Sequence, residues 1–397
     1  MLASAHPILV INNGSSSLKF SVLDAKSETL LSSGLAERIG TEQGSLKMTD
    51  LDQEKHQEKL ALADHRAALL RVIEILSGKG RFECKAIGHR VAHGGEYFRE
   101  PVLVTDNVLH KIEELGALAP LHNPANALGI RVAADIFPGK PQVAVFDTAF
   151  HQTLPPYAFH YAIPYELYEK YRVRRYGFHG TSHHYVTMEA ARRLGKPYDQ
   201  MQFISAHLGN GCSATAVKNG KSVDTTMGLT PLEGLVMGTR SGDVDPSLLL
   251  FLQEHEGWRL VKIIEILTRK SGLLGVSGVS HDMRSVVAAS DDGNARAKLA
   301  IDLFCYRLGR GILGLASSLS SLDALIFTGG IGENSALIRS KVLGHLAILN
   351  AEIDPKLNDE NGKQSDGRIT TGFGLLCLVI PTNEELMIAR ETDRLIP

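Results

Sequence analysis

Residues 8–23 read ILVINNGSSSLKFSVL, two apolar runs that flank a polar turn. The runs Ile8–Ile11 and Leu18–Leu23 predict the two strands of a hairpin. The turn carries three consecutive serines after a glycine, and its backbone N–H groups and hydroxyls suit a bound anion. The alternative is an ordinary tight hairpin, which does not need three serines. The stretch therefore predicts a strand hairpin whose turn binds phosphate, with Lys19 just beyond it as a further phosphate contact.

A second stretch has the same arrangement. Gln202–Leu208 is a strand-like run, followed by the turn Gly209-Asn210-Gly211-Cys212-Ser213 and by a second strand-like run that ends at Val217. This turn matches the start of a dinucleotide-binding fingerprint, which requires a helix next. Instead, the second run leads to Asn219-Gly220, a hairpin turn signal. The repeat therefore favours duplicated domains whose hairpin turns grip one polyphosphate, and it argues against a Rossmann domain.

The rest of the chain mixes strands and helices, which indicates the α/β class. The predicted further strands are Ala86–Val91, Gln142–Phe146, Ala324–Phe327 and Leu375–Ile380. The predicted helices include Asp64–Leu76, Asp106–Leu118, Thr181–Leu194 and Thr382–Leu395. We expect two domains, with a boundary near residue 150.

Composition excludes several classes of protein. The 42 Lys and Arg residues nearly balance 44 Asp and Glu residues, for a net charge of −2, so no basic surplus points to nucleic acid or an anionic membrane. No apolar run approaches the length of a membrane span. The four cysteines, at positions 84, 212, 305 and 377, form no CxxC pair. That pattern fits a reducing compartment and buried, inert thiols.

Three cationic residues lie in glycine-rich segments, where the backbone leaves room for a ligand. Arg90 lies in GHRVAHGGE (88–96), His179 in GFHGTS (177–182) and Arg240 in GTRSGD (238–243). Each is more often structural when it occurs alone. Together with two phosphate turns, they favour an active site that handles anions.

Carboxylates occur at two element boundaries. Asp147 follows a predicted strand directly, where open α/β sheets place ligand-binding residues. Thr382 and Glu385 have the spacing of a capping box, which gives Glu385 a structural role and leaves Glu384 able to bind a metal ion. Asn12, at the end of the first strand, offers a neutral oxygen that could share the ion directly or through water, as Mg²⁺ allows.

The motifs resemble those of the acetate kinase family, within the actin/Hsp70/hexokinase-like phosphotransferases. The segments NNGSSSLKF (12–20) and YGFHGTSH (176–183) are similar to the two family signatures. Further segments match in order: His89–Glu96, His207–Gly211, Gly329–Asn334 and Pro381–Glu385. The resemblance covers nearly the whole chain, and its long motifs are specific.

The resemblance implies an α/β fold of two duplicated actin/Hsp70/hexokinase-like (ribonuclease H-like) domains with an interdomain cleft. The first domain would comprise residues 1–149 and the returning helix 384–397, and residues 150–383 would form the nucleotide-binding domain. The implied activity is reversible, direct in-line phosphorylation of acetate by ATP to give acetyl phosphate and ADP. The resemblance also implies Mg²⁺, with Mn²⁺ as an alternative, and a cytoplasmic homodimer without nucleic acid or membrane partners.

Family roles transfer onto matching positions of this sequence. The catalytic positions are Asp147, His179 and Arg240, and the metal positions are Asn12 and Glu384. The substrate positions are Arg90, which would hold the carboxylate, and the pocket wall Ala92, Leu121, Phe178 and Pro231. The nucleotide positions are Lys19, His207, Leu208, Gly209, Asn210, Gly211, Asp282, Met283, Arg284, Gly330, Ile331, Gly332, Glu333 and Asn334.

One departure bears on the substrate. Ala92 stands where acetate-preferring members commonly have valine, and similar propionate kinases often carry alanine there. The smaller side chain would admit a longer acyl chain, so a propionate kinase is the alternative function. A protein of the same fold that only switches conformation with nucleotide is the alternative of another class. The arginines and His179 argue against it, because a switch needs no receptor for a carboxylate.

Overall fold

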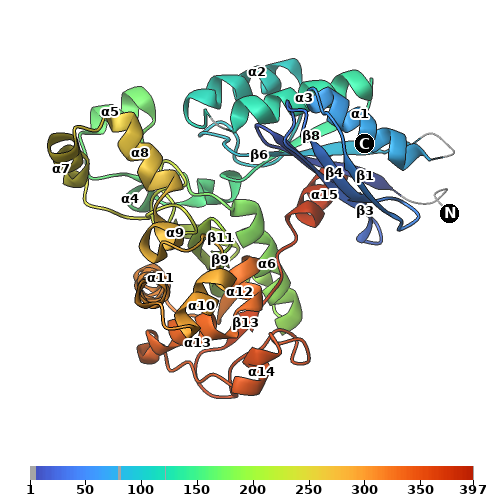
Figure 1. Ribbon diagram of the computed structural model, residues 1–397. Coiled ribbons are helices and arrows are strands. Elements are labelled where there is room, and N and C mark those ends of the chain that lie inside the picture. The colour runs from blue at the N-terminus through green and yellow to red at the C-terminus, as the bar shows by residue number, and fades with distance from the viewer. Residues whose placement is uncertain (1–5, 79–81, 121, 397) are drawn as a thin grey trace. The chain divides into compact units, whose positions relative to one another are not determined.

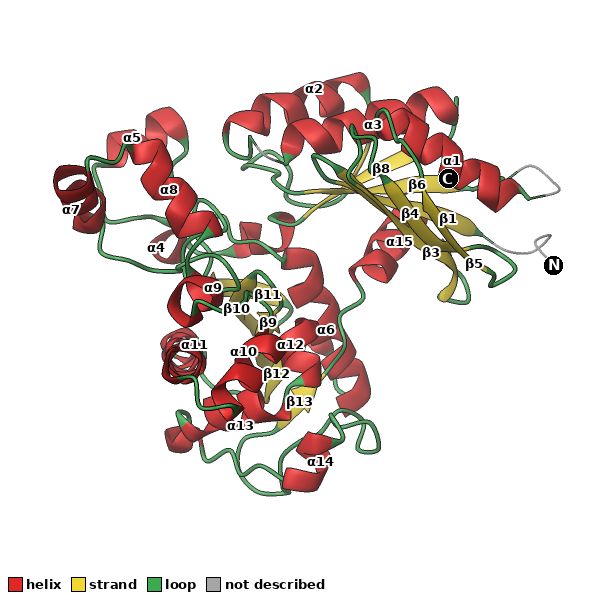
Figure 2. Cartoon of the chain, in the orientation of Figure 1, coloured by secondary structure: helices red, strands yellow, loops and turns green. Residues whose placement is uncertain are grey.

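The computed structural model describes residues 6–78, 82–120 and 122–396. The chain divides into two compact units, Met1–Phe150 with Asn383–Pro397, and His151–Thr382. Each unit has its own sheet and its own helices, as Figures 1 and 2 show. No helix among the described residues combines the length and apolarity needed to cross a membrane.

The sheet of the first unit has the strand order β5-β4-β3-β2-β1-β6-β8-β7. The predicted hairpin is confirmed: β1 pairs antiparallel with β2, whereas β1, β6 and β8 are parallel neighbours. The strands are β1 (Pro7–Asn13), β2 (Ser17–Asp24), β3 (Thr29–Glu37), β4 (Ser45–Thr49), β5 (Lys55–Lys59), β6 (Ala86–Val91), β7 (Val102–Leu103) and β8 (Gln142–Phe146).

Helices cover both faces of this sheet (Figure 1). The helices are α1 (His65–Ser77), α2 (Asp106–Glu114), α3 (Asn123–Ile136) and, from the end of the chain, α15 (Glu384–Leu395). The side chains of Leu9 and Ile11 pack with apolar residues of α1 and α3. Gly88 lies against Ile388 and Thr392 of α15, where a Cβ atom would be 2.5 Å from the Thr392 hydroxyl. Close approach of α15 therefore requires glycine in the centre of β6.

The second unit repeats the topology. Its sheet has the order β11-β10-β9-β12-β13, and the pairing is antiparallel for the first three strands and parallel for β9, β12 and β13. The first unit has this same pattern in β3-β2-β1-β6-β8. The strands are β9 (Gln202–Leu208), β10 (Cys212–Lys218), β11 (Lys221–Thr225), β12 (Ala324–Thr328) and β13 (Cys377–Val379). The shared pattern agrees with the expected duplicated fold.

The second sheet also lies between helices. Alternate residues of β9 point to opposite faces: Ile204 and Ala206 pack with the apolar side of α11, and Ser205 and His207 face α6. The helices are α4 (Pro156–Phe159), α5 (Tyr165–Tyr171), α6 (Gly180–Leu194), α7 (Ser247–Glu256), α8 (Leu260–Arg269), α9 (Gly272–Ser277), α10 (Met283–Asp291), α11 (Ala295–Ala316), α12 (Gly329–Asn334), α13 (Ala336–Gly344) and α14 (Pro355–Asp359).

Several predicted boundaries need correction. The predicted strand Leu375–Ile380 shortens to β13, and the predicted helix Asp106–Leu118 ends as an α-helix at Glu114 and continues as a 3₁₀ turn. The four cysteines are free and buried, as expected. Burial raises the pKa of each thiol, to about 11 for Cys84.

Two glycines of α11 differ in the space around them, so alanine substitutions at the two positions should have opposite effects on stability. A Cβ atom on Gly314 would meet no atom within 4 Å, whereas one on Gly309 would lie 2.8 Å from the Cβ atom of His345. Gly314→Ala should raise the free energy of unfolding by about 0.5–1 kcal/mol, because alanine favours a helix. Gly309→Ala should lower it by about 1–3 kcal/mol through overpacking. Denaturant unfolding of the two variants measures both, and equal effects would contradict this packing.

Candidate active site

Polar side chains of the first unit gather at the carboxyl ends of three parallel strands. Arg90 lies near the end of β6, Asp147 directly follows β8, and Asn12 lies near the end of β1. The Arg90 Nε donates to Asp147 Oδ1 over 3.2 Å, and its Nη2 donates to Oδ2 of the same carboxylate. The Arg90 Nη1 donates to Asn12 Oδ1 over 3.3 Å. Parallel pairing thus brings together three predicted residues that are far apart in the sequence.

Arg90 remains charged within this cluster. Burial opposes its charge, but Asp147 and Glu384 outweigh burial and raise the Arg90 pKa above its usual value. Arginine has five N–H donors, and three of its nitrogens each use one N–H on Asp147 or Asn12. The second N–H of each terminal nitrogen is left to donate to a ligand.

Glu384 is the second carboxylate of the cluster. Its pKa rises to about 7 because the group is desolvated and because the negative Asp147 is near, with Arg90 acting in the opposite direction. Among the residues that the structure describes, none makes a hydrogen bond or ion pair with the Glu384 carboxylate. Glu384 thus retains oxygens that can bind a cation.

The predicted capping box at the start of α15 is wrong. The helix begins at Glu384, and the N-cap is Asn383, whose Oδ1 accepts the N–H of Leu386 over 3.0 Å. The backbone of Asn383 is not helical, with φ −142° and ψ 74°, so the cap falls one residue later than Thr382. The carboxylate of Glu385 instead forms an ion pair with Lys19. Lys19, a predicted nucleotide residue, and its partner Glu385 both belong to the first unit. The cavity that collects most of the other predicted nucleotide residues belongs to the second unit.

A cavity of about 710 Å³ in the second unit collects most of the predicted nucleotide residues. Its volume is in the usual range for a small-molecule site. The predicted residues that line it are Gly209, Asn210, Asp282, Met283, Arg284, Gly330, Ile331 and Asn334. The sequence reasoning missed three further lining residues, His281, Val287 and Ser335. They neighbour predicted positions, and no motif marked them.

The other predicted nucleotide residues of this unit shape the strand ends and turns around the cavity. Gly329 has φ +74°, and a Cβ atom there would lie 2.8 Å from the Leu208 carbonyl oxygen, so only glycine fits between β9 and α12. The Glu333 carboxylate accepts the N–H groups of Gly329 over 2.9 Å and Thr382 over 3.1 Å. Glu333 thus fixes the turn after β12, and the Gly332 carbonyl accepts from Arg339 Nη1 over 2.8 Å. His207 and Gly211 lie at the end of β9 and in its hairpin turn.

His179 and Arg240 converge beside Gly211. A Cβ atom built on Gly211 would lie 3.3 Å from both the Arg240 Nη1 and the His179 Nε2. The Arg240 Nη1 also donates to the Pro231 carbonyl over 3.3 Å. Burial lowers the Arg240 pKa from its usual value, and the side chain stays charged at neutral pH. An arginine N–H donor and a histidine ring nitrogen therefore face one position, at the glycine-rich turn that lines the cavity.

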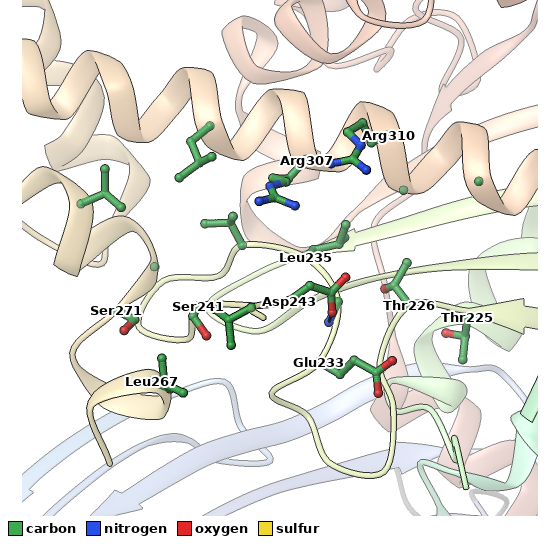
Figure 3. A pocket seen from close by; sticks show the side chains of 18 of the residues that line it. Thr225, Thr226, Glu233, Leu235, Ser241, Asp243, Leu267, Ser271, Arg307 and Arg310 are labelled. Atoms are coloured by element: carbon green, nitrogen blue, oxygen red, sulfur yellow. Dashed lines mark hydrogen bonds between the residues drawn. The ribbon is translucent and has the colours of Figure 1, made fainter. Parts of the chain in front are cut away.

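The loop that carries Arg240 is held on its other side. The Asp243 carboxylate accepts the Gly234 N–H over 2.7 Å, and the Ser271 N–H donates to the Thr239 carbonyl over 2.9 Å. A second cavity, of about 690 Å³, lies against this loop. Figure 3 shows the side chains that line it, among them Leu235, Ser241, Asp243, Leu267, Ser271, Arg307 and Arg310. No sequence motif predicted this cavity.

The residues predicted to form the wall of the acyl pocket belong to different units. Ala92 is buried in the first unit, and its N–H donates to Asn126 Oδ1 over 3.0 Å. Phe178, which is buried, and Pro231 belong to the second unit. The prediction for Leu121 falls outside the described residues.

Comparisons with known proteins identify the family of the chain. A model of the acetokinase family matches residues 7–390. A relative named acetate kinase from Ectopseudomonas mendocina (strain ymp) is 52% identical, over 99% of this chain and 100% of its own length. The crystal structure of a propionate kinase from Francisella tularensis has a TM-score of 0.93 and 46% identity, with 98% of this chain and 100% of that chain covered. The acetate kinase of Porphyromonas gingivalis has the same TM-score, with 42% identity and coverage of 99% and 100%. The chain therefore belongs to the acetokinase family.

Proposed function

We propose that the protein catalyses the reversible phosphorylation of acetate by ATP to acetyl phosphate, by direct in-line transfer. The convergence of His179 Nε2 and Arg240 Nη1 beside the nucleotide cavity carries the proposal. Relatives named acetate kinase, about half identical over nearly the full chain, support the same activity. The protein is accordingly a phosphotransferase with a carboxyl group as acceptor.

The acceptor needs no general base, because a carboxylic acid with a pKa of about 4 is ionised at neutral pH. The obstacle is the repulsion between two anions and the charge that develops on the transferring group. In the proposed mechanism, Arg90 binds the carboxylate through its remaining N–H donors. Asp147 orients Arg90 rather than acting as an acid or base. Arg240 and His179 donate to the equatorial oxygens of the phosphoryl group.

We propose that Asn12 and Glu384 hold Mg²⁺, with Mn²⁺ as the alternative. The donor set fits the ion: the two carboxylates Asp147 and Glu384 face one guanidinium, so one negative charge is left uncompensated, and hard oxygen ligands suit Mg²⁺. When bound, the ion would neutralise charge on the nucleotide phosphates. Arg90 would keep Asp147 and Asn12 in place around it.

We further propose a cytoplasmic homodimer, as the family resemblance implies. Helices α7 and α8 pack on each other and expose large apolar side chains, namely Leu250, Phe251, Leu260, Val261 and Ile264. Contiguous apolar surface of this kind is typical of a protein interface. Sedimentation equilibrium should give twice the mass of 43.1 kDa, and cell fractionation tests the location.

A propionate kinase is the second candidate, because Ala92 is small and buried. Hydroxylamine trapping of the acyl phosphate formed from ATP, Mg²⁺ and acetate, propionate or butyrate tests both. We expect hydroxamate from acetate and propionate. Ala92→Val should shift kcat/KM toward acetate by roughly tenfold or more, since one methylene is worth about 1–3 kcal/mol in an apolar pocket. No hydroxamate from any acid would contradict the kinase and favour a nucleotide switch.

Gly211 offers a steric test of the proposed donor pair. Gly211→Ala places a methyl group 3.3 Å from both donor nitrogens, where it competes with the phosphoryl oxygens. We expect kcat to fall on the order of 10²-fold, as for loss of one transition-state donor, and Arg240→Ala to fall by a similar or larger factor. Gly344→Ala, at the end of α13 and outside both cavities, serves as the control, because a Cβ atom there would also meet no atom within 4 Å. Near-normal kcat in both site variants would remove these residues from the mechanism.

The raised pKa of Glu384 predicts a pH dependence. The folded protein holds this proton up to about pH 7, whereas the unfolded chain releases it near 4.5, so stability falls as pH rises between these values. Mg²⁺ needs the ionised carboxylate, and it should therefore raise the melting temperature more at pH 8 than at pH 6. Both effects should be lost in Glu384→Gln.

The control for Glu384 lies on the same helix. Glu391 pairs with Arg394, and Glu391→Gln should keep both pH effects. Thermal melts with and without Mg²⁺ give the readout. Unchanged behaviour of Glu384→Gln would exclude Glu384 as a ligand.

A further inference from the structure

A chain of hydrogen bonds runs through buried side chains of the second unit and ends on His179. Ser205 Oγ lies 2.6 Å from His183 Nδ1, and His183 Nε2 lies 2.7 Å from Ser213 Oγ. Ser213 Oγ in turn lies 2.9 Å from His179 Nδ1. Ser205, His183 and Ser213 are fully buried. Neither the site motifs nor the proposed mechanism assigns a role to these three residues.

His183 carries a single ring proton. Burial, and then the nearby rings of His151 and His207, hold its pKa well below the usual 6.5, so the ring is neutral at pH 7. A neutral imidazole has one donor nitrogen and one acceptor nitrogen. Each serine hydroxyl also has one proton. The hydrogen bonds of the chain therefore all run in one direction or all in the other.

The Ser205 hydroxyl decides between the two directions. If His183 Nδ1 carried the proton, Ser205 Oγ would accept it, and the hydroxyl proton of Ser205 would need another acceptor. Within residues 6–78, 82–120 and 122–396, His183 is the only hydrogen-bond partner of that hydroxyl. A buried O–H without an acceptor is costly. The favoured direction therefore has Ser205 donating to His183 Nδ1, His183 Nε2–H donating to Ser213, and Ser213 donating to His179 Nδ1.

This direction fixes the proton of His179. Since Nδ1 of His179 accepts from Ser213, the proton of the neutral ring lies on Nε2. That nitrogen is the one that shares the position beside Gly211 with the Arg240 Nη1. We propose that His183 and Ser213 are positioning residues that keep His179 a donor through Nε2, so that it serves the phosphoryl oxygens without first gaining a proton. The inference rests on the proposed kinase function.

Ser213→Ala removes the link with a small change in volume. We expect kcat to fall roughly tenfold to hundredfold, less than the 10²–10³-fold typical of outright loss of a donor, because His179 itself remains. KM for ATP and for acetate should stay within about twofold. Histidine nitrogen NMR of the full-length protein, with His179 assigned from His179→Gln, should show the Nε2–H tautomer in the wild type. In Ser213→Ala it should show a mixture of both tautomers.

The control variant, Ser222→Ala, also removes a hydrogen bond between a buried serine and a histidine. Ser222 Oγ lies 2.9 Å from His151 Nδ1 and is also fully buried. Ser222→Ala should lower the melting temperature as Ser213→Ala does, with kcat unchanged. His183→Gln, whose amide can still donate to Ser213, should retain more kcat than His183→Leu.

Two results would overturn the inference: an unchanged His179 tautomer in Ser213→Ala, or equal losses of kcat in Ser213→Ala and Ser222→Ala. Failure of the proposed function has a different signature. In that case the wild type itself forms no hydroxamate, while the tautomer measurement still reports on the chain of hydrogen bonds from Ser205 to His179.

Discussion

The bidentate ion pair between Arg90 and Asp147 is the interaction on which the site of the first unit depends. Asp147 is 2% exposed, and an isolated buried carboxylate would be very costly. Its pairing with Arg90 compensates that cost and also fixes the plane of the guanidinium. The remaining donors of Arg90 then point in a defined direction, and Asn12 becomes part of the same hydrogen-bonded unit. Glu384, next to this pair, is left with a raised pKa.

In the proposed mechanism, the second unit places hydrogen-bond donors around the phosphoryl group. Glycine supplies the space: Gly211 leaves room beside His179 and Arg240, and Gly329 lets the turn after β12 approach Leu208. Hydrogen bonds hold these groups in place: the Asp243 carboxylate accepts the Gly234 N–H within the Arg240 loop, and the buried Ser213 bonds to His179. The proposed mechanism therefore relies on positioning and on charge, and it uses no nucleophile of the protein.

The sequence predicted the parts of this architecture that local pattern encodes. The strands Gln142–Phe146 and Gln202–Leu208 have the predicted bounds, because short buried apolar runs end where polar or glycine-rich turns begin. The cap of α15 was mispredicted, because Thr382 and Asn383 both suit an N-cap and only the path of the chain decides between them. The pairing of Arg90 with Asp147 and the chain from Ser205 to His179 depend on strand register. Arg90 and Asp147 are 57 positions apart in the sequence, and His179 and Ser213 are 34 positions apart. No local sequence pattern indicates that such distant residues are in contact.

Stereochemistry at phosphorus tests the central claim, that the phosphoryl group passes directly between nucleotide and carboxylate. The measurement uses ATP made chiral at the γ-phosphorus with oxygen isotopes and determines the configuration of the acyl phosphate. A single in-line displacement inverts the configuration, and the account predicts inversion. Retention would require a phosphorylated enzyme intermediate and would contradict a site built only from positioning groups and charge.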